Sequence, residues 1–284
     1  MRLLFNTIML EPNRWTADHA LTYPLTQLLD PIRGAGFEEL EIWQYHLSGL
    51  DRKGVAKVAE AISQSGLRAS ALGAYPLLHV SETEWEAARE QLERLIEYGT
   101  ELGIEALKIF PGRVASADAD ADTWSVSVER LQWLARELAA RGVLLTMETH
   151  GNTLCDTLGS ARRLLEELGA EANTGLCFQP YADDDTEAAM AVFDALRERV
   201  LHLHLQNRRG ADRVASLLEE GDWTDYRQFL PHVRESGFDG LSCLEFTAGI
   251  TPPDGEAFDL RLVVDNAARD RAFALAAWGV VPGH

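Results

Sequence analysis

Four polar side chains in the second half of the chain are of types that could bind a divalent cation together. Each ends or directly follows a short apolar run, and the four are Glu148, Gln179, His204 and Glu245. Two carboxylates, an imidazole and an amide oxygen are hard to borderline ligands, which suit Mn²⁺, Mg²⁺ or Zn²⁺ better than thiolate-bound metals. We therefore interpret these residues as a candidate metal site.

A structural interpretation is open at each of these positions. A glutamate at the end of a strand can simply pair with Lys108 or an arginine, and a single histidine is more often a hydrogen-bonded core residue than a ligand. The joint pattern favours a metal, because buried charges are costly unless they are paired or metal-bound. Without a cation, Glu148 and Glu245 would repel each other, so the loss of either charge should not weaken the fold.

The elements that must position these residues recur along the chain as a helical stretch, a glycine and a short apolar run. The glycines stand where helix C-caps adopt the left-handed conformation, at positions 36, 66, 103, 142, 169 and 237. The apolar runs are 3–9, 40–43, 68–72, 106–110, 144–149, 174–178, 200–205 and 241–246. Strands that alternate with helices eight times over 284 residues predict a single (β/α)8 barrel as one domain, residues 1–284.

Helix-period patterning supports this reading between the runs. Helices are expected over about 82–102, 124–141 and 259–277, with another that ends at Gly169. Ser81 and Glu84 have the spacing of a capping box. Pro231 interrupts a further helical pattern, which predicts a short, broken or restarted helix there.

The C-terminal ends of the strands are where reacting groups lie in such a barrel. Alternation of side chains along a strand places His204 on the same face as His202 and Gln206. Further polar residues that reach this end are candidates for binding substrate, and they are Glu41, Lys108, His150, Asn207 and Arg208. Arg208 could bind a carboxylate or phosphate, or lie in a solvated loop.

Composition narrows the class of protein. The net charge of −19 opposes nucleic acid and anionic membrane surfaces as partners. No apolar run approaches the roughly 20 residues that cross a bilayer. Three cysteines without metal-type spacing suit free thiols in a reducing cytoplasm, where we expect the protein.

Five short motifs, in order, resemble the xylose-isomerase-like TIM-barrel superfamily of sugar isomerases and epimerases, which also contains AP endonucleases. They are Gly-Phe-Glu-Glu-Leu-Glu-Ile-Trp at 36–43, Leu-Lys-Ile-Phe-Pro-Gly at 107–112, Met-Glu-Thr-His-Gly at 147–151, His-Leu-His-Leu-Gln-Asn at 202–207, and Gly-Phe-Asp-Gly at 237–240 leading into Leu-Glu at 244–245. Each motif alone is weak, but their order and spacing are specific to the superfamily.

The resemblance implies a divalent metal and a pair of catalytic glutamates. The family's metal ligands correspond here to Glu148, Gln179, His204 and Glu245, with Gln179 in place of the usual aspartate. The neutral amide implies weak metal binding. In the family's epimerases two glutamates, here Glu148 and Glu245, exchange protons on opposite faces of a sugar, through an enediolate. A sugar, sugar phosphate or polyol substrate and a homodimer are also compatible with the resemblance.

Three alternatives to an isomerase or epimerase follow from the same resemblance. A dehydratase or lyase on a cyclitol or keto acid would use the same enolate chemistry. A barrel that has lost its metal could bind a ligand without catalysis, and Gln179 favours that reading. An AP endonuclease is disfavoured, because Ala182 stands where its zinc site needs histidine, no Asp-x-His follows 200–205, and the net charge is −19.

Overall fold

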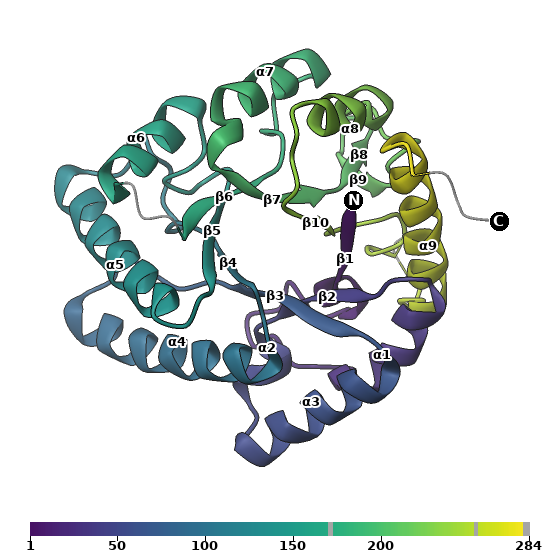
Figure 1. Ribbon diagram of the computed structural model, residues 1–284, viewed down its shortest axis with the longest axis horizontal. Coiled ribbons are helices and arrows are strands. Elements are labelled where there is room, and N and C mark those ends of the chain that lie inside the picture. Colours follow the sequence, from purple (N-terminus) through teal and green to yellow (C-terminus); the bar gives the residue numbers. More distant parts are fainter. Residues whose placement is uncertain (170–172, 253–254, 281–284) are drawn as a thin grey trace.

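The computed structural model describes residues 1–169, 173–252 and 255–280. Its centre is a closed barrel of parallel strands, in the order β1-β10-β7-β6-β5-β4-β3-β2, surrounded by helices (Figure 1). The barrel strands are β1 (Arg2–Asn6), β2 (Glu39–Trp43), β3 (Arg68–Ala74), β4 (Ala106–Ile109), β5 (Leu144–Glu148), β6 (Thr174–Phe178), β7 (Val200–Leu205) and β10 (Leu241–Leu244). The (β/α)8 barrel expected from the alternating pattern is confirmed.

The helices follow the strands in sequence and cover the outside of the barrel. They are η1 (Thr7–Leu10), α1 (Leu25–Gly34), α2 (Tyr45–Ser48), α3 (Arg52–Ser65), α4 (Glu82–Leu102), α5 (Ala121–Ala139), α6 (Leu158–Leu168), α7 (Thr186–Leu196), η2 (Arg197–Arg199), α8 (Tyr226–Glu235) and α9 (Leu260–Ala277). In the part of the chain that the structure describes, no helix combines the length and the apolar character needed to cross a membrane.

Helix ends are fixed by the local chemistry that the sequence indicated. Ser81 and Glu84 form the predicted capping box at the start of α4. Gly103 ends that helix at φ 82°, in the left-handed region where a side chain would be strained. The backbone N–H of Gly103 satisfies carbonyls of the last turn, so the chain can turn directly into β4.

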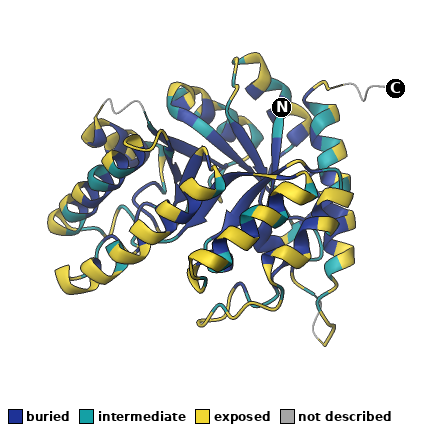
Figure 2. Ribbon diagram, turned by 60° about the horizontal axis from the view of Figure 1, so that its bottom comes forward, coloured by how far each residue is buried: buried dark blue, intermediate teal, exposed yellow. Residues whose placement is uncertain are grey.

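Two apolar layers pack on the two sides of the barrel wall. The larger lies between strands and helices, where the helices bury one face and expose the other (Figure 2). The smaller lies inside the barrel and is made of Leu4, Ala71, Ala106, Leu241 and Cys243. Above this inner layer the interior is polar, because the side chains that point inward near the strands' C-terminal ends are carboxylates, histidines and a lysine.

Two local expectations were wrong, and one was right in part. The first strand ends at Asn6, whose side chain accepts a hydrogen bond from the N–H of Ile8 and starts η1 instead. The helical pattern that Pro231 interrupts is a short helix, which was one of the expected outcomes: α8 spans Tyr226–Glu235 and continues through Pro231 without a break. A proline removes one backbone N–H donor from a helix, so the loss of hydrogen bonding in α8 is confined to one position. An antiparallel hairpin, β8 (Asn207–Arg209) with β9 (Val214–Ser216), follows β7 where a loop was expected.

A buried carboxyl group joins this hairpin region to the barrel. Asp270 of α9 accepts hydrogen bonds from the N–H of Leu218, at 2.7 Å, and from the hydroxyl of Thr247, at 2.5 Å. Leu218 follows β9 and Thr247 follows β10, so one side chain fixes the two loops that lie after β7 and β10. Burial outweighs these hydrogen bonds and raises the pKa of Asp270 to about 7.

The raised pKa predicts a stability that falls as pH rises. The unfolded chain loses this proton near its ordinary pKa of 3.8, whereas the folded chain keeps it to about 7. The stabilisation that protonated Asp270 contributes is therefore complete below about pH 4 and is lost progressively as the pH rises to about 7. Between pH 5 and pH 8 wild type should lose about 2–3 kcal/mol through this group, whereas Asp270→Asn should not, so the fall in melting temperature should be about 5–10 °C smaller in the variant. Thermal melts followed by circular dichroism at both pH values test this, with the exposed Asp265→Asn on the same helix as control. Equal pH dependence in wild type and Asp270→Asn would contradict it.

Candidate active site

The C-terminal ends of β5, β7 and β10 bring three predicted ligands to one point. Nδ1 of His204 lies 3.6 Å from Oε1 of Glu148 and 3.4 Å from Oε1 of Glu245. All three side chains are buried, and their ligand atoms lie within 4.8 Å of one another. Nδ1 of His204 forms no hydrogen bond with any residue that the structure describes. Nδ1 of His204, without a hydrogen-bond partner among the described residues, thus faces two carboxylate oxygens inside the barrel.

The fourth predicted ligand has other partners. Gln179 donates from Nε2 to Oε1 of Glu148, at 2.9 Å, and its Oε1 accepts from Nε2 of Gln206, at 2.6 Å. Gln206 also donates to Oε2 of Glu245, at 2.6 Å, and accepts from Arg208 at Oε1, at 2.6 Å. Arginine can only donate and carboxylates can only accept, so the orientation of both amides is determined. The oxygen of Gln179 therefore points to Gln206, and its amino group supports Glu148.

Lys108 is the direct counter-ion of Glu148. Its Nζ lies 2.8 Å from Oε2 of Glu148, and both side chains are completely buried. Burial disfavours the ammonium ion, but the charge of Glu148 raises the pKa of Lys108 well above its usual range. Burial likewise disfavours the carboxylate, yet Lys108 and His204 hold the pKa of Glu148 well below its usual range. The pairing of a strand-end glutamate with Lys108, one of the two readings of the sequence, is present here for Glu148.

Glu41 lies deeper in the barrel, beneath His204. Its Oε2 is 3.1 Å from Nε2 of His204 and 3.2 Å from Nε2 of His202, and its Oε1 accepts from Nδ2 of Asn6. Burial raises the pKa of a carboxyl group, but the adjacent histidines lower the pKa of Glu41 to about 2. Its candidate role in binding substrate stays a prediction, although it is fully buried and contacts other protein groups.

The charges in this interior do not balance without a further positive charge. Glu41, Glu148 and Glu245 are carboxylates, while Lys108 is the one lysine among them. A proton on His204 is the nearest remedy: burial opposes it, but Cys177 and the surrounding carboxylates raise the pKa of His204 well above its usual range. A divalent cation at the unpartnered Nδ1 would supply the missing charge more fully. The donor set of Glu148, His204 and Glu245 therefore fits a divalent metal.

A cavity of about 390 Å³ opens above this point. Glu245, Gln206 and Arg208 lie among its lining residues, together with His150, which the sequence also marked. Aromatic side chains make up much of its wall, and they are Trp15, Trp43, Tyr45, Tyr75, Phe110 and Phe246. Arg113 completes the wall, with its guanidinium 5.7 Å from the ring centre of Tyr75 and 5.8 Å from that of Phe110. A cavity that is aromatic, cationic and small suits an anionic ring compound.

Sequence reasoning missed Arg113 and Trp15, and it placed Asn207 differently. Arg113 and Trp15 lie in loops after strands, where the sequence offers no periodic signal. The side chain of Asn207 is buried and holds the hairpin loop, with donors to the carbonyls of Leu218 and Thr224. A role of Asn207 in substrate binding stays a prediction that these loop contacts do not support.

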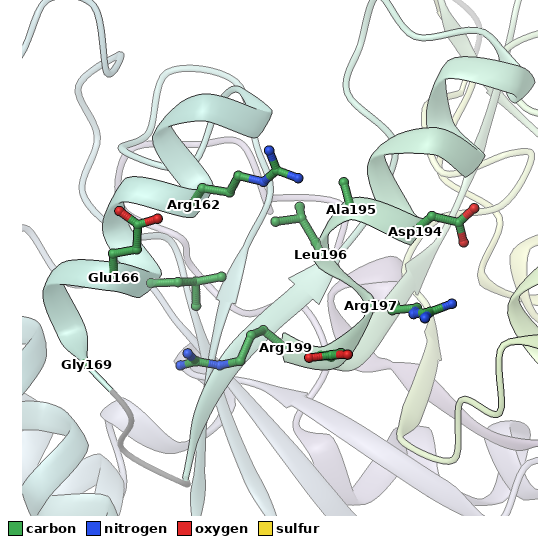
Figure 3. Close-up of a pocket in the computed structure, with 10 residues that line it drawn as sticks. Arg162, Glu166, Gly169, Asp194, Ala195, Leu196, Arg197 and Arg199 are labelled. Atoms are coloured by element: carbon green, nitrogen blue, oxygen red, sulfur yellow. The ribbon is translucent and has the colours of Figure 1, made fainter.

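A second hollow, of about 670 Å³, lies at the opposite end of the barrel (Figure 3). It is formed where α6 ends and where η2 leads into β7, and both charge signs line it, including Arg162, Glu166, Asp194 and Arg197. In (β/α)8 barrels the reacting groups lie at the other end, at the C-termini of the strands. This hollow is therefore not part of the candidate active site.

Comparison with known proteins identifies relatives along most of the chain. A model of the xylose isomerase-like TIM barrel family matches residues 29–263. The 3-dehydroshikimate dehydratase of Bacillus anthracis is 25% identical over 181 residues, which cover 62% of this chain and 64% of that enzyme. The aligned part is thus slightly less than two thirds of the relative's length.

Solved structures share the fold. A probable 3-DHS dehydratase from Bacillus anthracis superposes with a TM-score of 0.72 at 21% identity, over 96% of this chain and 99% of that one. A xylose isomerase-like TIM barrel protein from Mycobacterium smegmatis, in complex with magnesium, gives 0.72 at 15% identity, over 98% and 97%. D-Psicose 3-epimerase from Clostridium cellulolyticum H10, with D-tagatose, gives 0.75 at 15% identity, over 98% and 99%. At these identities the likeness establishes the fold alone.

The buried ion pair predicts a large cost for removing one partner. Glu148→Gln leaves the Lys108 ammonium buried without its counter-ion, so the free energy of unfolding should fall by about 3–5 kcal/mol. This corrects the expectation that loss of the Glu148 charge would not weaken the fold, which considered only its repulsion from Glu245. Lys108→Met in the same chain should recover part of this loss, because no unpaired charge then remains. Urea unfolding followed by circular dichroism measures both. Glu137→Gln, in an exposed pair with Arg141, is the control and should change stability by less than about 1 kcal/mol. Unchanged stability of Glu148→Gln would show that the Lys108 pair contributes nothing.

The state of His204 predicts how metal binding depends on pH. A metal at Nδ1 must displace the proton that the surrounding carboxylates favour, so the affinity for Mn²⁺ should rise from about pH 6 to about pH 8. Calorimetric titrations in two buffers of different ionisation enthalpy should register proton release on binding. His204→Ala should lose the metal and the proton release while the barrel stays folded. Binding without proton release across this range would place the ion away from His204.

Proposed function

Because the chain belongs to the xylose isomerase-like TIM barrel family, we propose that it is a metal-dependent dehydratase of a small cyclic hydroxy ketone that carries a carboxylate. The observation that carries the proposal is the convergence of Glu148, His204 and Glu245 at the foot of an aromatic, arginine-containing cavity. The dehydratase relative supports this class over the sugar isomerase or epimerase that the sequence motifs first favoured.

Glu148, His204 and Glu245 would hold the divalent metal. When bound there, the metal would polarise the substrate's carbonyl oxygen and stabilise the negative charge that develops as the neighbouring proton leaves. Gln179 and Lys108 fix the position of Glu148 from outside the ligand set, and Gln206 does the same for Glu245. Preorganised contacts of this kind limit the motion of the ligands during the reaction.

Glu245 is the better candidate for moving the proton. It lines the cavity, whereas Glu148 is completely buried and tied to Lys108 and Gln179. Oε2 of Glu245 accepts one hydrogen bond from Gln206 and keeps a lone pair, which would be available to a C–H group of a substrate in the cavity. The proton that Glu245 takes from carbon would be returned to the hydroxyl group on the adjacent carbon, which leaves as water.

The burial of Glu148 also bears on the choice between dehydratase and epimerase. An epimerase that works through two carboxylates must deliver a proton to the opposite face of the substrate, which needs a second mobile carboxyl group at the cavity. A dehydratase needs one such group, since the same carboxyl can accept the carbon proton and donate to the leaving hydroxyl. A single glutamate at the cavity surface therefore favours dehydration.

The cavity wall supports a carboxylated ring as substrate. Arg113 stacks against Tyr75 and Phe110 and has no carboxylate partner among the residues that the structure describes, so its donors are available to an anion. Arg208 uses one of its donors on Gln206 and lies over Phe246. Flat aromatic walls favour a planar or half-planar ring over a flexible open-chain sugar.

Turnover of 3-dehydroshikimate by the Mn²⁺-loaded protein is the first test, with formation of the aromatic product followed by absorbance. Glu245→Gln should lower kcat by about 10²-fold or more, because the proton acceptor is lost. Arg113→Met should raise KM with a smaller effect on kcat, since it removes an anion contact. Arg209→Met, in the exposed hairpin, is the matched control and should leave both constants unchanged.

Other outcomes separate the alternatives. Exchange of substrate hydrogen for solvent deuterium without loss of water, on a ketose, would indicate an epimerase instead. Binding of the carboxylate without turnover, in a protein that takes up no Mn²⁺, would indicate a ligand-binding barrel. Either result contradicts the dehydratase proposal.

A further inference from the structure

Glu41 is a buried carboxylate that the proposed reaction does not use directly. It lies on β2 and is fully buried, and it reaches across the barrel interior to β7. Nδ2 of Asn6, on β1, donates to Oε1 of Glu41 at 3.0 Å, and this contact orients the carboxylate. Both oxygens then lie 3.1–3.2 Å from Nε2 of His204. A buried charge is costly unless neighbouring groups pair with it or donate hydrogen bonds to it, so the contacts of Glu41 with Asn6 and His204 need an explanation.

The contact determines which nitrogen of His204 carries the proton. A neutral imidazole has one N–H, and a carboxylate can only accept. Nε2 must therefore be the donor to Glu41, which leaves the lone pair on Nδ1. That nitrogen faces Oε1 of Glu148 and Oε1 of Glu245, which are also acceptors. Three lone pairs that point at one another require a positive charge among them, which is either a proton on Nδ1 or a metal ion that replaces it.

The neighbouring backbone leaves room for this arrangement. Gly73 on β3 has no side chain, and a Cβ there would lie 3.2 Å from Oε1 of Glu41 and 3.5 Å from Cε of Lys108. Most contacts to a Cβ are longer than 3.2 Å, so an alanine would press on the carboxylate. Gly73 thus allows Glu41 and Lys108 to fill the interior side by side.

We propose that Glu41 is a positioning residue, which accepts the Nε2 proton of His204 and thereby presents an unprotonated Nδ1 to the divalent metal. The inference rests on the metal site of the proposed function. It gives Glu41 a role in metal affinity rather than in contact with substrate. Carboxylates behind metal-bound histidines typically contribute about 10–100-fold to affinity.

A different arrangement would place a second ion deeper in the barrel. Glu41, His202, His204 and Cys243 have ligand atoms within 4.8 Å of one another. The positioning role is favoured, because Asn6 and His204 already occupy the oxygens of Glu41, and burial raises the pKa of the Cys243 thiol well above its usual range. The number of ions bound per chain separates the two arrangements.

Calorimetric titration of the full chain with Zn²⁺ and with Mn²⁺ tests the proposal. Wild type should bind one ion, and Glu41→Gln should bind one ion about 10–100-fold more weakly. Glu39→Gln is the matched control: Glu39 is a buried glutamate on the same strand, but it pairs with Arg2 and Arg68 at the opposite end of the barrel. The control should lose stability and keep the metal affinity of wild type. Gly73→Ala should displace the Glu41 carboxylate without removing it, and should therefore also weaken ion binding. This second variant tests the proposal even if Glu41→Gln folds poorly.

A spectroscopic measurement follows the tautomer itself. In the Zn²⁺-loaded protein labelled with ¹⁵N, long-range imidazole spectra should show the His204 proton on Nε2 in wild type and in Glu39→Gln. Glu41→Gln should shift or broaden this signal, because an amide can donate to Nε2 and favour the other tautomer.

Each result bears on a defined claim. Equal ion affinity of wild type and Glu41→Gln, a His204 proton on Nδ1 in the loaded wild type, or two ions per chain would each overturn the role of Glu41. Lack of any ion binding by wild type would contradict the proposed function and this inference with it. Normal ion binding without dehydration of any carboxylated ring would contradict the proposed function and leave the role of Glu41 standing.

Discussion

The excess of negative charge inside the barrel is the constraint on which the rest of the site depends. Glu41 and Glu148 are completely buried and Glu245 lies at the foot of the cavity, so water stabilises their charges little. Lys108 balances one of them and is itself held between the rings of Tyr75 and Phe110, at 4.5 Å and 5.0 Å from their centres. The remaining charge requires a cation or a proton near His204. The fold therefore provides a place where a divalent metal is electrostatically favoured.

Closure of the barrel is what brings these groups together. Parallel strands point their C-terminal ends to the same side, so residues far apart in sequence meet at one mouth. The inner layer below is built of small and medium side chains, such as Ala71 and Ala106, which fill the narrow base. Long polar side chains can then occupy the space above. The same geometry explains why Glu39, two residues before Glu41, points to the opposite end and serves Arg2 and Arg68 instead.

The features predictable from sequence are those set by local periodicity. Alternating apolar runs and capping glycines gave the eight barrel strands, and α4 was predicted with its bounds and its capping box. Strand-end position also brought Glu148, His204 and Glu245 to one point, as the structure has them. Tertiary partners were not accessible in this way. Alternation along a strand places Gln206 on the same face as His204. Its hydrogen bonds to Gln179 and Glu245, however, depend on residues that follow two other strands. The hairpin of β8 and β9 and the position of Arg113 depend on loop conformation, which carries no periodic signal.

The departure at Gln179 has a physical explanation in this network. An aspartate at this position would add a further negative charge to an interior that already has too many, and it could not donate to Glu148. The amide does both tasks that the network needs: its amino group supports Glu148 and its oxygen accepts from Gln206, which Arg208 orients in turn. Arg208 thus acts at a distance on both carboxylates through two neutral amides. Compared with a set that includes an aspartate, the proposed ligand set carries one negative charge less, but its two carboxylates are held in place by the amides. Under the proposed function, weaker attraction for the metal would leave substrate binding to depend more on the wall of the cavity, where Arg113 and the aromatic rings lie.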